Sequence, residues 1–137
     1  MISVHPYTAW TLWVLYLGVL FSLSELPGGV VPMPFAWFDK VLHFMEYIPL
    51  PVVTLRAFAT LPWKVVKHHP FASAIVFSIL YAASDEIHQI TNLTRQPDPL
   101  DFLADSLGVL AGTWLVHGIH LKHHRRKSRR LPVAASR

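Results

Sequence analysis

Four stretches of about 20 mostly apolar residues constrain this chain more than any other feature of its sequence. They cover residues 8–26, 40–61, 71–91 and 100–121. The hydrocarbon core of a bilayer is roughly 30 Å thick, so each stretch is long enough to cross it as a helix. The chain is 53% hydrophobic and only 15% charged, with a mean hydropathy of +0.38, which is too apolar for an ordinary soluble domain. We therefore predict an all-α membrane protein that folds as a four-transmembrane-helix bundle.

Prolines mark the limits of these helices, because proline removes a backbone donor and clashes with the preceding turn. The gaps between the stretches contain Pro27, Pro32, Pro34, Pro62, Pro70, Pro97 and Pro99. Pro49 and Pro51 lie inside the second stretch, where we expect a kink rather than a break between two elements. No internal repeat or linker separates a second domain. We predict a membrane domain over residues 1–121 and a basic, disordered cytoplasmic tail over residues 122–137.

The distribution of charge predicts the orientation. Lys64, Lys67 and most basic residues of the tail fall on one side of the predicted bundle, which the positive-inside rule places in the cytoplasm together with both termini. The opposite side holds all eight acids: Glu25, Asp39, Glu46, Asp85, Glu86, Asp98, Asp101 and Asp105. Lys40 and Arg95 are the basic residues on that side. We expect a multi-pass protein of the bacterial cytoplasmic (inner) membrane with an acidic extracytoplasmic end.

Helical spacing directs several of these polar groups toward one place. Asp39, His43 and Glu46 or Tyr47 share a face, as do Asp85 and His88 or Gln89, with Glu86 on a neighbouring face. Asp101, Asp105, Gly108 and Gly112 form one stripe whose two glycines allow another helix to approach closely. Three helices thus aim acids at one outward-opening site. The absence of cysteine excludes disulfides, thiol catalysis and thiolate metal sites.

The segments that carry these residues resemble the VanZ-like membrane proteins. "DKVLHFMEY" and "LYAASDEIHQITNLTRQPDPLDFLADSLGVLAG" are similar to the family pattern, which joins D-K-x-x-H-F, E-x-x-Q, an R and D-x-x-x-N-x-x-G. The resemblance covers roughly residues 39–112 and marks Asp39, Lys40, His43, Phe44, Tyr47, Glu86, Gln89, Arg95, Asp101 and Gly108. The chain departs from the pattern at Asp105, where the family usually has Asn.

The resemblance implies a role at the cell envelope, because the founding member of the family is associated with reduced susceptibility to the lipoglycopeptide teicoplanin. It implies no mechanism. Some members are labelled phosphotransbutyrylases, but nothing in this chain resembles a soluble acyl-CoA site. From residues and resemblance together, the predicted polar site comprises Asp39, Lys40, His43, Tyr47, Asp85, Glu86, Gln89, Arg95, Asp101 and Asp105.

Three function classes and one structural alternative remain open. In the first, the site binds or alters a lipid-linked or cell-wall molecule at the outer leaflet. In the second, the protein is a metal-dependent membrane enzyme in which Glu86, Asp101 and Asp105 hold a divalent cation, with His43 as acid or base. In the third, it is a small transporter or assembly partner whose Glu46 and His43 relay protons. The structural alternative is an interhelical network, in which the polar groups only pair with one another.

The basic tail predicts a second type of contact. A basic stretch just past a membrane helix typically binds anionic lipid heads, and the membrane tether makes lipid a better partner than nucleic acid. The tail also spaces His117, His120, His123 and His124 by one to three residues, which leaves a metal as the alternative ligand there.

Overall fold

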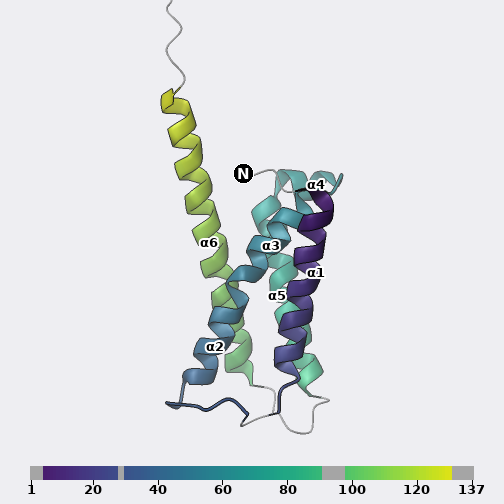
Figure 1. The fold of residues 1–137 in the computed structure, drawn as a ribbon, viewed down its shortest axis with the longest axis vertical. Helices are drawn as coiled ribbons and strands as arrows, with labels where there is room; N and C mark the ends of the chain where they lie inside the picture. The colour runs from purple at the N-terminus through teal and green to yellow at the C-terminus, as the bar shows by residue number, and fades with distance from the viewer. Residues whose placement is uncertain (1–4, 28–29, 91–97, 131–137) are drawn as a thin grey trace, which may run out of the picture.

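A computed structural model describes residues 5–27, 30–90 and 98–130, and the side chains of residues 123–130 are outside the description. Every regular element in the described part of the chain is an α-helix (Figure 1). The prediction of an all-α protein is therefore confirmed for these residues.

Three of the helices are long and apolar enough to cross a membrane. They are α1 (Pro6–Ser24), α5 (Pro70–Gln89) and the segment Pro99–Lys122 of α6 (Pro99–Arg130). Each begins with a proline, which is favoured in the first helical turn because the amide donors there have no intrahelical acceptor. The three helices correspond to the first, third and fourth predicted spans, within two residues at each end.

The second predicted span consists of two helices, α2 (Phe38–Tyr47) and α3 (Pro49–Phe58). Ile48 separates them and keeps helical backbone angles, with φ −59° and ψ −47°. Pro49 and Pro51 remove two intrahelical donors on either side of Leu50, so the hydrogen-bond ladder is interrupted although the chain stays helical. We expected a single kinked helix here, and the interruption divides it into two. Neither half alone is long enough to cross a bilayer.

A short helix, α4 (Lys64–His68), lies in the connection between α3 and α5. We did not predict it. It lies at the same end of the bundle as the N-terminus of α1, while α2 and the N-terminus of α6 lie at the other end (Figure 1).

Helix α6 packs against α2 through the predicted glycine stripe. A Cβ atom at Gly108 would lie 2.3 Å from the carbonyl oxygen of Phe44, and one at Gly112 would lie 2.0 Å from that of Ile48. No side chain fits at these distances, so glycine is required for the two backbones to meet. Asp101 and Asp105, on the same stripe, are buried as well, and the predicted inward orientation of the stripe is confirmed.

The interior combines a small apolar core with interhelical hydrogen bonds from aromatic side chains. Leu20, Tyr47, Leu50, Ala82 and Val109 form the buried core. Nε1 of Trp13 donates to Oγ1 of the buried Thr54 at 3.1 Å, which joins α1 to α3. Large apolar side chains such as Leu80 and Trp114 are exposed on the outside of the helices. Their exposure suits contact with lipid rather than with water.

Helix α6 continues beyond the membrane-length segment to Arg130. The predicted tail was expected to lack structure from residue 122. Basic residues are good helix formers and interact favourably with the negative end of the helix dipole, which is a physical reason for the extension. Residues 131–137 are outside the described residues.

Candidate functional site

Four helices bring their polar residues together at one end of the bundle. The C-termini of α1 and α5, the N-terminus of α6, and α2 meet at the end opposite to α4 (Figure 1). The described acids all lie in these parts of the chain or beside them. Their side chains form two clusters beside a small cavity. His43 belongs to one of the clusters and also lines the cavity.

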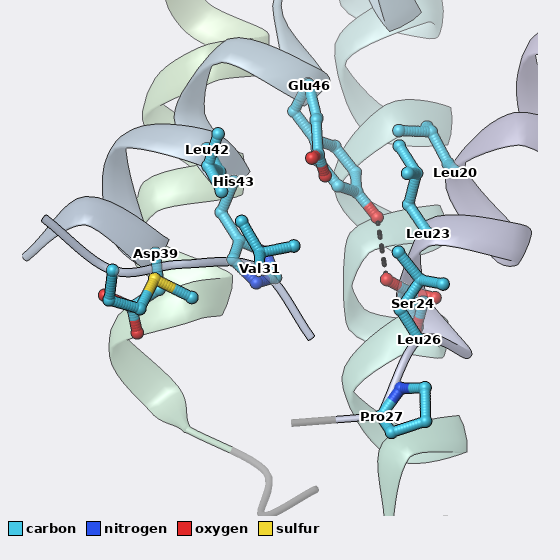
Figure 2. A pocket seen from close by; sticks show the side chains of 13 residues that line it. Leu20, Leu23, Ser24, Leu26, Pro27, Val31, Asp39, Leu42, His43 and Glu46 are labelled. Atoms are coloured by element: carbon cyan, nitrogen blue, oxygen red, sulfur yellow. Dashed lines mark hydrogen bonds between the residues drawn. The ribbon is translucent and has the colours of Figure 1, made fainter. Parts of the chain in front are cut away.

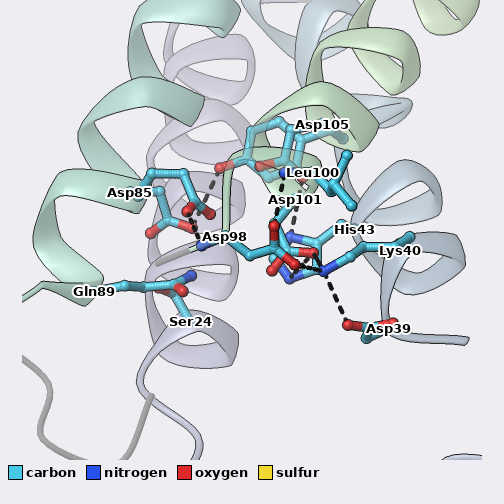
Figure 3. Close-up of polar contacts among 12 residues, drawn as sticks. Ser24, Asp39, Lys40, His43, Asp85, Gln89, Asp98, Leu100, Asp101 and Asp105 are labelled. Atoms are coloured by element: carbon cyan, nitrogen blue, oxygen red, sulfur yellow. Dashed lines mark hydrogen bonds and ion pairs between the residues drawn. The ribbon is translucent and has the colours of Figure 1, made fainter. Parts of the chain in front are cut away.

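The first group, here called the Lys40 cluster, consists of Lys40, Asp39, Asp98 and Asp101 (Figure 3). Lys40 Nζ lies 2.6 Å from Asp101 Oδ1 and 3.0 Å from Asp39 Oδ2, and it also donates to Asp98 Oδ2. The ammonium group joins α2 to the start of α6, and it balances the charge of one of the three carboxylates.

Asp98 is positioned by its place at the start of α6. Its Oδ1 accepts a hydrogen bond from the backbone amide of Leu100 at 2.9 Å, which is how a residue before a helix caps the first turn. The hydrogen bond from Lys40, followed by the one from the Leu100 amide, holds the pKa of Asp98 below its usual range. The Asp98 carboxyl group is therefore ionised at neutral pH.

The second group, here called the His43 cluster, consists of His43, Glu86 and Asp105, from α2, α5 and α6. His43 Nδ1 lies 3.1 Å from Asp105 Oδ1. Glu86 Oε2 accepts a hydrogen bond from the backbone amide of Asp98 at 3.2 Å, which connects the two clusters. The second oxygen of each carboxylate, Glu86 Oε1 and Asp105 Oδ2, is buried and has no hydrogen-bond partner among the described residues. This cluster is therefore left with two unsatisfied acceptors, whereas the Lys40 cluster contains its own cation.

Three further contacts connect α5 to α1 and α2. Tyr47 donates its hydroxyl to Asp85 Oδ2 at 3.4 Å, and Gln89 donates to Ser24 at 3.3 Å. At the rim, His88 Nε2 lies 2.6 Å from an oxygen of Glu25. The first contact joins α2 to α5, and the other two hold the end of α1 against the end of α5.

A cavity of about 90 Å³ opens beside these contacts, between α1, α2 and α5 (Figure 2). Its polar side includes Asp39, His43, Glu46 and Asp85. Its apolar side is formed by Leu20, Leu23, Leu26, Val31, Leu42 and other residues of α1, α2 and the segment between them. The cavity can therefore accept a polar group that is attached to an apolar one.

The structure places nine of the ten predicted site residues at this end of the bundle, and Arg95 lies outside the described residues. Lys40 contacts the start of α6 and also pairs with Asp39, whereas His43 and Tyr47 face inward from α2. Asp85, Gln89, Asp101 and Asp105 are buried in the interhelical contacts given above. Their role in binding or catalysis stays a prediction.

Two residues outside the predicted set complete the geometry. Asp98 binds Lys40 and positions Glu86, and its sequence signal was an acid directly before a proline, which is typical of a helix start. Ser24 accepts from Gln89 and lines the cavity. No signal in the sequence singles it out from the other serines.

A family model described as VanZ/LLP1 matches residues 3–121, which is nearly the whole chain and spans α1 to α5 and α6 as far as Leu121. No curated protein and no solved structure matches the chain.

Proposed function

This chain belongs to the VanZ/LLP1 family, and we propose that it binds or acts on a cell-envelope or lipid-linked molecule at the extracytoplasmic face of the bacterial cytoplasmic membrane. In this proposal the pair α2–α3 forms a fourth span, and both termini are cytoplasmic. The association of the family with teicoplanin susceptibility is compatible with a ligand of this kind.

The cavity carries the proposal. One side of it is apolar, and the other offers carboxylates and an imidazole. At about 90 Å³ it is much smaller than the pockets that enclose a whole small molecule, so it accommodates a group of a few heavy atoms. The rest of a lipid-linked ligand would lie along the exposed apolar surface of the helices, which faces the bilayer.

The charge distribution supports the outward orientation of this cavity. The described acids gather at the cavity end, whereas Lys64, Lys67 and the basic end of α6 lie toward the other end (Figure 1). Lys and Arg near membrane helices favour the cytoplasmic side. The cavity then opens at the outer leaflet, where lipid-linked cell-wall precursors are used.

A substitution that fills the cavity tests the proposal. Leu23→Trp adds bulk to the apolar side of the cavity, and Leu15→Trp places the same side chain on an exposed face of the same helix. Native mass spectrometry of the purified protein would compare retention of a polyprenyl-diphosphate-linked cell-wall precursor with that of a plain phospholipid.

We expect selective retention of the precursor by the native protein and by Leu15→Trp, and at least a tenfold loss with Leu23→Trp. Membrane abundance and thermal unfolding show whether each variant is folded. Equal retention by the two folded variants, or no preference for the precursor in the native protein, would contradict the proposal.

A further inference from the structure

The His43 cluster has the composition of a metal site. His43, Glu86 and Asp105 each offer one ligand atom, and the three atoms lie within 4.8 Å of one another. Ligand atoms around an ion bonded at about 2.1 Å are roughly 3 to 3.5 Å apart. Binding therefore requires these ligand atoms to approach one another by roughly 1 to 2 Å.

The unsatisfied oxygens are an independent observation that points to a ligand. Asp105 is 0% exposed, and its Oδ2 has no hydrogen-bond partner in the described part of the chain. The same holds for Glu86 Oε1, which is buried although the residue as a whole is partly exposed. A buried carboxylate oxygen without a partner is costly, and native proteins satisfy nearly all such atoms. A cation bound by both residues would give these oxygens a partner.

The remaining polar atoms of the cluster hold the ligands in position. Asp105 Oδ1 lies against His43 Nδ1, and Glu86 Oε2 accepts from the amide of Asp98. A hydrogen bond from Nδ1–H leaves the lone pair on Nε2, as in many sites where a carboxylate orients a ligating imidazole. Each carboxylate thus uses one oxygen for the protein and keeps the other for a ligand.

Asp101 does not belong to this ligand set, although the sequence suggested it together with Glu86 and Asp105. Its Oδ1 is 2.6 Å from Lys40 Nζ and 3.8 Å from His43 Nε2. Lys40 already neutralises it, and a divalent cation beside that ammonium would be repelled. The geometry replaces Asp101 with His43.

We propose that His43, Glu86 and Asp105 bind one divalent transition-metal ion of the Zn²⁺ or Mn²⁺ type. One imidazole nitrogen and two carboxylate oxygens suit such ions better than Mg²⁺ or Ca²⁺, which prefer oxygen alone. The two carboxylates balance the ionic charge. Three protein ligands leave at least one position for water or another group, and His43 also lines the cavity. This inference goes beyond the proposed function, because metal binding can be measured without any lipid.

The test needs a protein in which the tail cannot bind the metal. The background is the full chain with His117→Gln, His120→Gln, His123→Gln and His124→Gln, purified without a histidine tag and stripped with a chelator. Zn²⁺ and Mn²⁺ are titrated by calorimetry. The Co²⁺ absorption spectrum reports the ligand geometry of the intact site.

We expect one ion per chain, a higher thermal unfolding temperature with metal, and a Co²⁺ spectrum typical of nitrogen and oxygen ligands. Asp105→Asn and Glu86→Gln should each weaken binding at least about tenfold, since even second-shell changes cost that much. Glu25→Gln is the matched control, because Glu25 is an acid at the same end of the bundle paired with His88, and it should bind like the background.

Two results would overturn the inference. One is the absence of stoichiometric binding in the stripped background protein, which would mean that the chain itself supplies the missing donors. The other is equal affinity in Glu86→Gln, Asp105→Asn and the Glu25→Gln control. Because the background protein is tested directly, a variant that fails to fold does not prevent a decision. Loss of precursor binding in the cavity experiment would leave this result unaffected.

Discussion

Neighbouring carboxylates at the polar end differ in how they are neutralised. Asp101 is buried and lies 2.6 Å from Lys40 Nζ, whereas Asp105 is buried with one oxygen unpartnered among the described residues. The two residues are one helical turn apart on α6. A single turn therefore separates a carboxylate paired with a lysine from one that, among the described residues, contacts only the imidazole of His43 and keeps an unpartnered oxygen. The first is expected to stabilise the fold, while the second has an oxygen available to a ligand.

Removal of Lys40 tests the structural part of this division. Lys40→Met keeps the length of the side chain but leaves the buried Asp101 carboxylate without its cation. Breaking a buried ion pair costs about 3 to 5 kcal/mol, so we expect the free energy of unfolding in detergent to fall by about 3 kcal/mol. Lys67→Met, on the exposed surface at the other end, is the control and should have little effect.

A double variant identifies the partner. Adding Asp101→Asn to Lys40→Met removes the stranded charge, and residues of one network couple by about 0.5 to 3 kcal/mol. We expect the double variant to be more stable than the sum of the single effects predicts. Strictly additive effects would mean that the contact between Lys40 and Asp101 does not contribute to stability.

At this scale the sequence predicted which residues gather but not how they pair. Helical spacing placed His43, Asp101 and Asp105 on inward faces, because faces follow from the 3.6-residue period. Which acid Lys40 contacts depends on the relative height of α2 and α6 and on the cap that Asp98 forms. Neither can be read from periodicity, so the sequence left open that Asp101 pairs with Lys40.

At the scale of the elements, the close packing of α2 against α6 depends on glycine. A Cβ at Gly112 would overlap the carbonyl oxygen of Ile48, whereas one at Gly118, on the same helix, meets nothing within 4 Å. Gly112→Ala should therefore lower the free energy of unfolding by about 1 to 3 kcal/mol, as overpacking does. Gly118→Ala should raise it by about 0.5 to 1 kcal/mol, since alanine loses less backbone entropy than glycine in a helix. Thermal unfolding in detergent compares the two.

If both alanine variants change stability in the same direction, close packing at the seam is not what requires glycine. Gly108→Ala is a second test of the seam and should also lower the free energy of unfolding, because its Cβ would overlap the carbonyl oxygen of Phe44.

Helix boundaries were predictable where proline begins an element, as at Pro70 and Pro99. The division of the second span into two helices at Ile48 was less predictable. Pro49 and Pro51 indicate a lost hydrogen-bond ladder, but whether the chain bends or separates into two helices depends on packing against neighbours. The short helix α4 was missed because five residues are too few to show a helical period.

The whole molecule has opposite charges at its two ends. Acids collect where α1 and α5 end and α6 begins, and Lys64, Lys67 and the basic end of α6 lie toward the other end (Figure 1). If the basic end is cytoplasmic, the cavity and the His43 cluster face the extracytoplasmic side. An inverted protein would place both in the cytoplasm, and an outer-leaflet ligand would then be excluded.

Single cysteines distinguish the two orientations. The native chain has no cysteine, so each introduced thiol is the one reactive group. Val30 is 58% exposed near the acidic end, and Val65 is 70% exposed on α4. In intact cells an impermeant maleimide should label Val30→Cys and not Val65→Cys, and both should react once the membrane is opened. The reverse pattern would place the acidic end in the cytoplasm. Both sites could instead be labelled in intact cells while a cytoplasmic marker stays protected, which would place α4 on the outer side. The chain would then cross the membrane an even number of times between Val30 and Val65, so α2–α3 would not be a fourth span.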